Sequence, residues 1–151
     1  MFLRNVGDHI RGKYLSLVVE ALLPADEFRG YVPSYVFGIL RHGTWDRVGR
    51  ISLRLGNNEL TTQYAGHIGY SVDMAHRGNG YAGKACLLLV DLAKEHDFST
   101  IYITCDPDNY ASKRTIEKLG AQLVDVVNVP RETEIYRRGE RIKLRFAWDL
   151  K

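Results

Sequence analysis

A glycine-rich segment in the middle of the chain carries the clearest chemical signal of the sequence. It runs over residues 71–85, and Gly78, Gly80 and Gly83 fall between an apolar run and the start of a helical pattern. The first amides of a helix have no partner within the helix, and glycine lets an anionic group approach them closely. The segment is therefore predicted to bind an anion, such as the phosphates of a cofactor.

Two other phosphate-binding motifs have to be weighed against this segment. Gly78-x-Gly80-x-x-Gly83 has the glycine spacing of a dinucleotide-binding fingerprint, but that motif needs its first glycine directly after a strand. Here residues 73–77 intervene, and only 68 residues follow Gly83. A Walker A motif needs Gly-Lys-Ser/Thr, which does not occur. A nicotinamide or flavin site remains an alternative, as does a purely structural turn.

A second motif follows the first in the chain. Residues 106–112 read Asp-Pro-Asp-Asn-Tyr-Ala-Ser, and residues 117–121 read Glu-Lys-Leu-Gly-Ala. Together with the spacing Arg-x-x-Gly-x-Ala that begins at Arg77, this segment resembles the GNAT superfamily of acetyl-CoA-dependent N-acetyltransferases. The resemblance covers about residues 34–128, and two spaced motifs in the right order make it specific.

The resemblance implies a mixed sheet with a V-shaped splay between its fourth and fifth strands, expected here at residues 66–72 and 101–105. Acetyl-CoA would lie in the splay, with its pyrophosphate on the glycine-rich loop and its pantetheine arm along the fourth strand. A backbone N–H near Val72 would stabilise the oxyanion of the reaction. The Asn109 side chain would hold the pantetheine arm, or simply cap a helix. The residues implied in cofactor binding are Val72, Met74, Arg77, Gly78, Asn79, Gly80, Tyr81, Ala82, Gly83, Asn109 and Ser112.

An acid is expected near this splay, because the thiolate that leaves acetyl-CoA can take up a proton. Many family members carry a tyrosine seven residues after the asparagine, where this sequence has Ile116. The Asn-x-x-Ser spacing instead resembles the branch that acetylates ribosomal-protein N-termini. That resemblance implies Ser112 as the acid, with Tyr110 as an alternative.

A base is also expected, because only a neutral amine attacks the thioester. His67 stands where many relatives carry a glutamate, just before Ile-Gly-Tyr, and its ordinary pKa of about 6.5 suits proton abstraction at neutral pH. A structural histidine on a sheet face is the competing interpretation. Glu59 is the alternative carboxylate. Direct attack needs little acid–base help when the two reactants are held together.

The elements that must position these residues follow from hydrophobic periodicity. Apolar residues at helical spacing predict a helix over residues 80–96, and Asp108 or Asn109 is expected to cap a second helix that ends at Gly120. Strands are expected at residues 14–20, 34–41, 47–55, 66–72, 101–105, 121–128 and 141–149. This order predicts an α+β fold, with a mixed, mostly antiparallel sheet flanked by helices and a local parallel βαβ segment.

The composition describes one globular domain, predicted to span residues 1–151. With 45% hydrophobic and 26% charged residues, a chain of this length can fold without a metal or disulfide. The net charge of +3 is mild, and the basic residues of 137–145 are expected to form a solvated hairpin rather than a nucleic-acid surface.

Cys86 and Cys105 lie in apolar runs without C-x-x-C spacing, so reduced core thiols in a cytoplasmic protein are expected. No apolar run reaches the length of a membrane span, and the histidines lack metal-ligand spacing.

Together these observations predict a cytoplasmic N-acetyltransferase that moves an acetyl group from acetyl-CoA to a primary amine by direct transfer, without a metal. The acceptor is expected to be a small-molecule amine or a protein N-terminus, with no nucleic-acid or membrane partner. A homodimer would be in keeping with the family. A CoA-binding sensor or interaction module with a degenerate site is the alternative, because Ile116 replaces the usual acid of the family.

Overall fold

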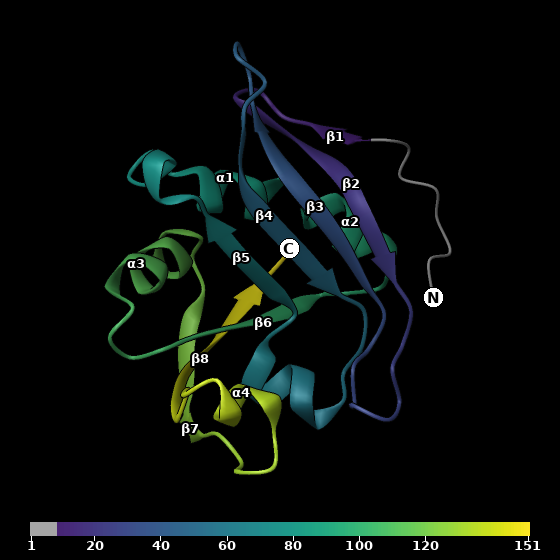
Figure 1. Cartoon of the computed structure of the whole chain (residues 1–151), viewed down its shortest axis with the longest axis vertical. Helices are drawn as coiled ribbons and strands as arrows, with labels where there is room; N and C mark the ends of the chain where they lie inside the picture. The colour runs from purple at the N-terminus through teal and green to yellow at the C-terminus, as the bar shows by residue number, and fades with distance from the viewer. Residues whose placement is uncertain (1–8) are drawn as a thin grey trace.

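The computed structural model describes residues 9–151, which form two sheets with helices packed against them (Figure 1). The first sheet has the strand order β1-β2-β3-β4-β5, and the second has the order β6-β8-β7. This arrangement confirms the predicted α+β fold with mostly antiparallel strands flanked by helices. The single domain predicted over 1–151 includes residues 1–8, which lie outside the described part of the chain.

The first sheet is a meander of five strands. They are β1 (His9–Arg11), β2 (Leu15–Leu23), β3 (Ser34–Arg41), β4 (Arg47–Arg54) and β5 (Ile68–Val72). β3 has the predicted bounds, whereas β1 is too short to leave an alternating pattern in the sequence. The hairpin between β3 and β4 turns at Gly43, whose φ of +93° lies in the left-handed region that glycine adopts without strain.

The second sheet consists of β6 (Thr100–Cys105), β7 (Gln122–Asn128) and β8 (Ile142–Asp149). β8 lies between the other two strands and pairs antiparallel with both. Phe146 and Trp148 on β8 are buried in the core, as alternate positions on one strand face require. Lys143 and Arg145, on the other face, are only 8% and 7% exposed, so the prediction of a solvated hairpin over 137–145 is wrong for these two residues, whereas Arg137, Arg138 and Arg141 are exposed.

The connection between β5 and β6 holds the longest helical segment. It contains η2 (Met74–His76), α1 (Tyr81–Leu88) and α2 (Val90–Glu95). The helix predicted over 80–96 is therefore two helices, because Leu89 caps the end of α1 and the start of α2. α3 (Tyr110–Lys118) has the predicted cap, since Asn109 Oδ1 accepts the Ser112 N–H at 3.1 Å.

Two short helical turns stand at one end of the molecule. They are η1 (Leu60–Ala65), a π-helical turn between β4 and β5, and α4 (Glu134–Arg137), between β7 and β8. Both lie in the lower part of Figure 1, and residues from both line one cavity. The sequence does not predict either turn, because such short segments leave no helical period.

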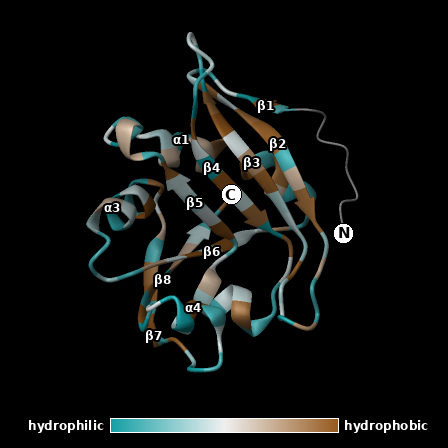
Figure 2. Cartoon of the chain, in the orientation of Figure 1, coloured by the Kyte–Doolittle hydropathy of each residue, from teal (hydrophilic) through white to brown (hydrophobic). Residues whose placement is uncertain are grey.

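The hydrophobic core lies between the first sheet and helices α1 and α2, and it includes the inner face of the second sheet. Figure 2 shows hydrophobic stretches along β2, β3 and β4. The largest fully buried side chains are Tyr35, Phe37, Phe146, Leu15, Leu17 and Ile39. Burial of one sheet face fixes the strand register, because a shift by one residue would turn the apolar side chains to solvent.

β5 and β6 join at one end and then separate, which is the splay that the family resemblance implies. At the joint, the His67 N–H donates to the Tyr102 carbonyl oxygen at 2.7 Å. Gly66 packs directly against β6, since a Cβ atom there would lie 3.1 Å from backbone atoms of Thr104 and Tyr102. Beyond this joint the two strands belong to different sheets, so the predicted parallel βαβ pairing does not form among residues 9–151.

Candidate active site

The loop between β5 and α1 is fixed to the strand that it follows. Arg77 Nε donates to the Val72 carbonyl oxygen at 3.0 Å. Gly78 and Gly80 have φ angles of +86° and +73°, and Gly80 is the N-cap of α1. A residue with a Cβ atom is strained in this left-handed conformation, so the turn into the helix depends on glycine at both positions.

The backbone amides of residues 78–83 have no hydrogen-bond acceptor within the described part of the chain. The next amide, that of Lys84, donates to the Gly80 carbonyl oxygen at 3.1 Å and begins the helical pattern. Unpaired amides at the start of a helix attract anions such as phosphate. These residues line a groove of about 650 Å³ between α1 and α3, which we call the cofactor groove.

The cofactor groove gathers most of the residues predicted to bind the cofactor. Its lining includes Val72, Arg77, Gly78, Asn79, Gly80, Tyr81, Ala82, Gly83, Asn109 and Ser112. Met74, which was also predicted, is 80% exposed and does not line the groove. The further lining residues Arg114 and Lys118 add positive charge, which suits an anionic ligand.

One edge of β5 is free to pair with a ligand. Along an antiparallel pair, residues that share backbone hydrogen bonds alternate with residues that do not. The bond from the Asp73 N–H to the Val48 carbonyl oxygen, 2.8 Å long, fixes this alternation between β5 and β4. The amides of Ile68, Tyr70 and Val72 therefore face away from β4, toward the space between β5 and β6.

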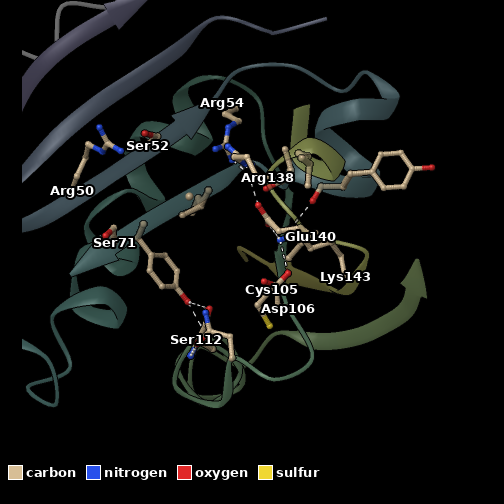
Figure 3. Close-up of a pocket in the computed structure, with 18 residues that line it drawn as sticks. Arg50, Ser52, Arg54, Ser71, Cys105, Asp106, Ser112, Arg138, Glu140 and Lys143 are labelled. Carbon is tan, nitrogen blue, oxygen red and sulfur yellow. Dashed lines mark hydrogen bonds and ion pairs between the residues drawn. The ribbon is translucent and has the colours of Figure 1, made fainter. Parts of the chain in front are cut away.

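A second cavity, of about 330 Å³, opens between β4, β5, β6 and α4, and we call it the acceptor cavity (Figure 3). It shares four lining residues with the cofactor groove: Tyr70, Ser71, Asn109 and Ser112. Two cavities with a common wall can hold two reactants against each other, as a direct group transfer requires.

Two hydroxyl groups meet at this common wall. Tyr70 Oη on β5 and Ser112 Oγ on α3 are 2.7 Å apart. Figure 3 shows Ser112 at the edge of the cavity with this hydrogen bond. Burial raises the pKa of the Tyr70 phenol, so Tyr70 stays protonated and can donate to Ser112. The sequence predicts a role for Ser112 but not for Tyr70, whose partner lies 42 residues away along the chain.

Tyr110, the alternative acid, lies outside the common wall. Its side chain is 65% exposed at the start of α3, and it lines neither the cofactor groove nor the acceptor cavity. Ile116, at the position of the usual tyrosine of the family, is fully buried in the core. Of the predicted acids, only Ser112 is brought to the meeting of the groove and the cavity.

His67 belongs to the joint between β5 and β6 rather than to either cavity. Its side chain is 1% exposed, its Nδ1 accepts the Tyr102 N–H at 2.9 Å, and its Nε2 lies 2.9 Å from Asn57 Oδ1. Burial lowers the pKa of His67 to about 4, so the ring is neutral and carries its proton on Nε2. The structure therefore does not support His67 as the base, because both ring nitrogens are engaged away from the common wall.

The carboxylates at the acceptor cavity are paired. Asp106 Oδ1 lies 2.9 Å from Lys143 Nζ, and Glu140 contacts both Lys143 and Arg138. Glu59, the alternative base, is exposed and lines neither the groove nor the cavity. Within residues 9–151, no unpaired carboxylate lines either of them.

The segment that contains this site is similar to a known protein family. Residues 19–122 match the family model described as the acetyltransferase (GNAT) domain. The match covers more than half of the chain and contains the loop, β5 and α3. The chain belongs to the GNAT acetyltransferase family.

Several solved structures share the fold of this GNAT domain. A GNAT-family acetyltransferase from Bacillus anthracis is 23% identical, with a TM-score of 0.60 over 76% of this chain and 66% of that one. Ribosomal-protein-S5-alanine acetyltransferase from Vibrio fischeri is 19% identical, with a TM-score of 0.61 over 78% and 62%. RimJ from Mycobacterium smegmatis, in complex with CoA-disulfide, is 22% identical, with a TM-score of 0.59 over 77% and 53%.

These likenesses concern the fold of the GNAT domain. The chain spans about half to two thirds of the length of the three proteins. No curated protein sequence is similar enough to match. In residues 9–151, no group of three or more histidine, cysteine, aspartate or glutamate side chains is placed to hold a metal ion. No helix in that part of the chain is both long and apolar enough to cross a membrane.

Proposed function

We propose that this GNAT domain transfers the acetyl group of acetyl-CoA to a primary amine while holding both substrates at once. The observation that carries the proposal is the common wall between the cofactor groove and the acceptor cavity. The groove offers unpaired amides to an anionic cofactor, and the cavity opens beside the same hydroxyl groups. Two substrates placed in this way can react directly, with no covalent enzyme intermediate.

Residues of the groove supply the contacts that acetyl-CoA needs. The amides of residues 78–83 would hold the pyrophosphate, because they are unpaired and positive side chains surround them. The free edge of β5 would pair with the pantetheine arm as with an added strand. The Val72 N–H on that edge would donate to the thioester carbonyl oxygen, which gains negative charge when the amine attacks. The CoA-disulfide in the RimJ structure supports a ligand of this class.

We infer a role for Ser112 as the acid that protonates the leaving thiolate of CoA. The amine nitrogen forms a bond to the acetyl carbon, the carbon–sulfur bond breaks, and the leaving thiolate takes up a proton. Ser112 would give that proton, with Tyr70 Oη as its hydrogen-bonded donor. The amine releases one proton, which returns to the hydroxyl pair through water in the open acceptor cavity. We assign no side chain as the base, since the carboxylates there are paired and His67 lies elsewhere.

Binding and turnover together test the proposed function. Calorimetric titration with CoA should show binding, and acetyl-CoA with a panel of primary amines should release free thiol together with an acetylated product. The panel should include small amines and peptides with free N-termini. Absence of CoA binding would overturn the proposal. CoA binding without acetylation of any amine would instead favour a CoA-binding sensor or interaction module.

We also propose the cytoplasm as the location of the protein. Cys86 and Cys105 are both free and buried, and burial raises the pKa of the Cys86 thiol to about 12. Buried, unpaired thiols of this kind are typical of proteins in a reducing compartment. Localisation of the tagged protein in its own cells would test this point.

A further inference from the structure

One face of β4 places two arginines in the acceptor cavity. Arg50, Ser52 and Arg54 occupy alternate positions and line the cavity, while Ile51 and Leu53 between them are fully buried in the core. Ser71 on β5 lies opposite Arg50 and lines the same cavity. Figure 3 shows both arginines and both serines along this wall. The wall therefore presents hydrogen-bond donors to whatever enters the cavity.

Arg54 is built into the cavity without an acidic partner. Its Nη1 donates to the carbonyl oxygens of Ala65 and Gly66 at 3.2 and 2.9 Å, which fixes the guanidinium in place. Gly69 makes room for it, since a Cβ atom at Gly69 would lie 2.8 Å from Arg54 Nη2. Burial and the charge of Arg138 lower the pKa of Arg54, in keeping with the absence of a carboxylate beside it.

The other charges of the acceptor cavity do not neutralise the arginine wall. The lining holds the cations Arg50, Arg54, Arg138 and Lys143, and the anions Asp106 and Glu140. Both carboxylates are paired with Lys143, and Glu140 also with Arg138. Neither Arg50 nor Arg54 forms an ion pair within the described part of the chain. The lining of the cavity thus holds four cations and two anions, and the charge of Glu20, outside the cavity, also acts on Arg50.

We propose that the acceptor is a primary amine that also carries an anionic group, a carboxylate or a phosphate, and that Arg54 and Arg50 bind this group. This inference rests on the proposed function. A guanidinium binds either anion through paired hydrogen bonds, and Ser52 and Ser71 add hydroxyl donors. Polyamines and other acceptors with a second cation would be disfavoured, because like charges repel in a partly buried site.

Binding of reaction products tests the inference without relying on turnover. The protein is saturated with CoA and titrated with matched pairs: 6-acetamidohexanoate and 6-acetamidohexanamide, and N-acetyl-Ser-Glu-Ala-amide and N-acetyl-Ser-Gln-Ala-amide. In at least one pair, the anionic member should bind about tenfold more tightly than its neutral partner. The first pair would indicate a small-molecule acceptor, and the second a protein N-terminus.

Variants connect this preference to the arginines. Arg54→Met and Arg50→Gln should each reduce the preference for the anion severalfold and leave CoA affinity unchanged. Arg131→Met is the matched control, since it removes the same charge from an exposed position outside both cavities, and it should retain the full preference. Arg50 is exposed, so its variant tests the inference even if Arg54→Met folds poorly.

Each result of these titrations decides the matter. The inference would be overturned if the anionic and neutral members bind equally in both pairs, or if none of the four compounds binds. It would also be overturned if both arginine variants keep the wild-type preference for the anion. Anion preference without acetylation of any amine would support the anion site and overturn the proposed function. Acetylation without anion preference would support the proposed function and overturn the anion site.

Discussion

Tyr70 Oη and Ser112 Oγ lie 2.7 Å apart, although one residue belongs to β5 and the other to α3. The hydrogen bond links β5 to the first turn of α3. Asn109 supports the same contact, because its Oδ1 accepts the Ser112 N–H at 3.1 Å and so positions the first turn of the helix. The cap at the start of α3 thus helps to hold Ser112 at the wall that the cofactor groove and the acceptor cavity share.

Removal of either hydroxyl should slow acetyl transfer without weakening cofactor binding. Ser112→Ala removes the proposed acid and should lower kcat about 100-fold, in the range of general acid catalysis. Tyr70→Phe removes one hydrogen bond to that acid and should lower kcat up to about tenfold. Steady-state kinetics combined with calorimetry of CoA binding would measure both effects.

Tyr110→Phe is the matched control for this pair, since Tyr110 is exposed and lines neither cavity. It should keep the wild-type kcat. A loss of rate in Tyr110→Phe equal to that in Tyr70→Phe would contradict the assignment of the acid. Wild-type kcat in Ser112→Ala would do the same.

The left-handed turn before α1 should matter for cofactor affinity. Gly80→Ala places a Cβ atom at a φ of +73°, which costs about 1–2 kcal/mol and shifts the unpaired amides. We expect weaker CoA binding, measured by calorimetry, together with a lower free energy of unfolding.

Gly43→Ala introduces the same kind of strain at a φ of +93° in the hairpin between β3 and β4. No atom lies within 4 Å of its added Cβ, and Gly43 does not line the cofactor groove. This variant should lose stability to a similar extent and bind CoA like the wild type. A parallel loss of affinity in both variants would show that general destabilisation, and not the loop, sets CoA binding.

Protein stability should depend on pH through His67. The folded-state pKa is about 4 and the ordinary value is 6.5, so the unfolded chain binds more protons between these pH values. The free energy of unfolding should therefore fall by about 3 kcal/mol as the pH drops from 6.5 to 4. Denaturant titrations at a series of pH values would measure the slope.

His67→Gln should flatten this pH dependence and lower stability at neutral pH, because the contacts with Tyr102 and Asn57 are disturbed. The folded fraction should keep its rate of acetyl transfer. Loss of that rate in a variant with normal stability would return His67 to the role of base.

Arg145 should contribute to stability despite its charge. Its Nε donates to the Thr62 carbonyl oxygen at 2.7 Å, and its guanidinium lies 4.1 Å from the centre of the Tyr102 ring and 3.4 Å from Asp125. Arg145→Ala should lower the free energy of unfolding by about 2 kcal/mol, since it removes the hydrogen bond to Thr62, the contact with the Tyr102 ring and the ion pair with Asp125. Arg137→Ala, at an exposed position on α4, should change it by less than about 0.5 kcal/mol. Equal effects of the two variants in urea denaturation would contradict this role.

The sequence predicts the cofactor side of the molecule better than the acceptor side. The loop around Gly78 and Gly80 and the cap at Asn109 are local features, since neighbouring residues determine each of them. The strand at 34–41 has the predicted bounds because its apolar pattern is strong and its ends are marked by turns. The family assignment rests on two such local motifs and is confirmed.

The features that the sequence does not predict depend on contacts between distant segments. Burial of His67 results from packing against β6, and the partner of Tyr70 comes from α3. Lys143 and Arg145 alternate with apolar residues as surface residues would, yet both are buried: Arg145 contacts η1, and Lys143 pairs with Asp106 and Glu140. The homodimer and the location in the cytoplasm stay predictions.

The close packing of Gly66 on β6 has a consequence for cofactor entry. The two sheets are pinned at one point by main-chain atoms, so the angle between them is preorganised before any ligand arrives. Little conformational entropy should then be lost on docking, and free and liganded forms should superpose closely along β5 and β6. The joint between the two sheets is therefore rigid, and ligands bind to the groups that lie beyond it along β5 and β6.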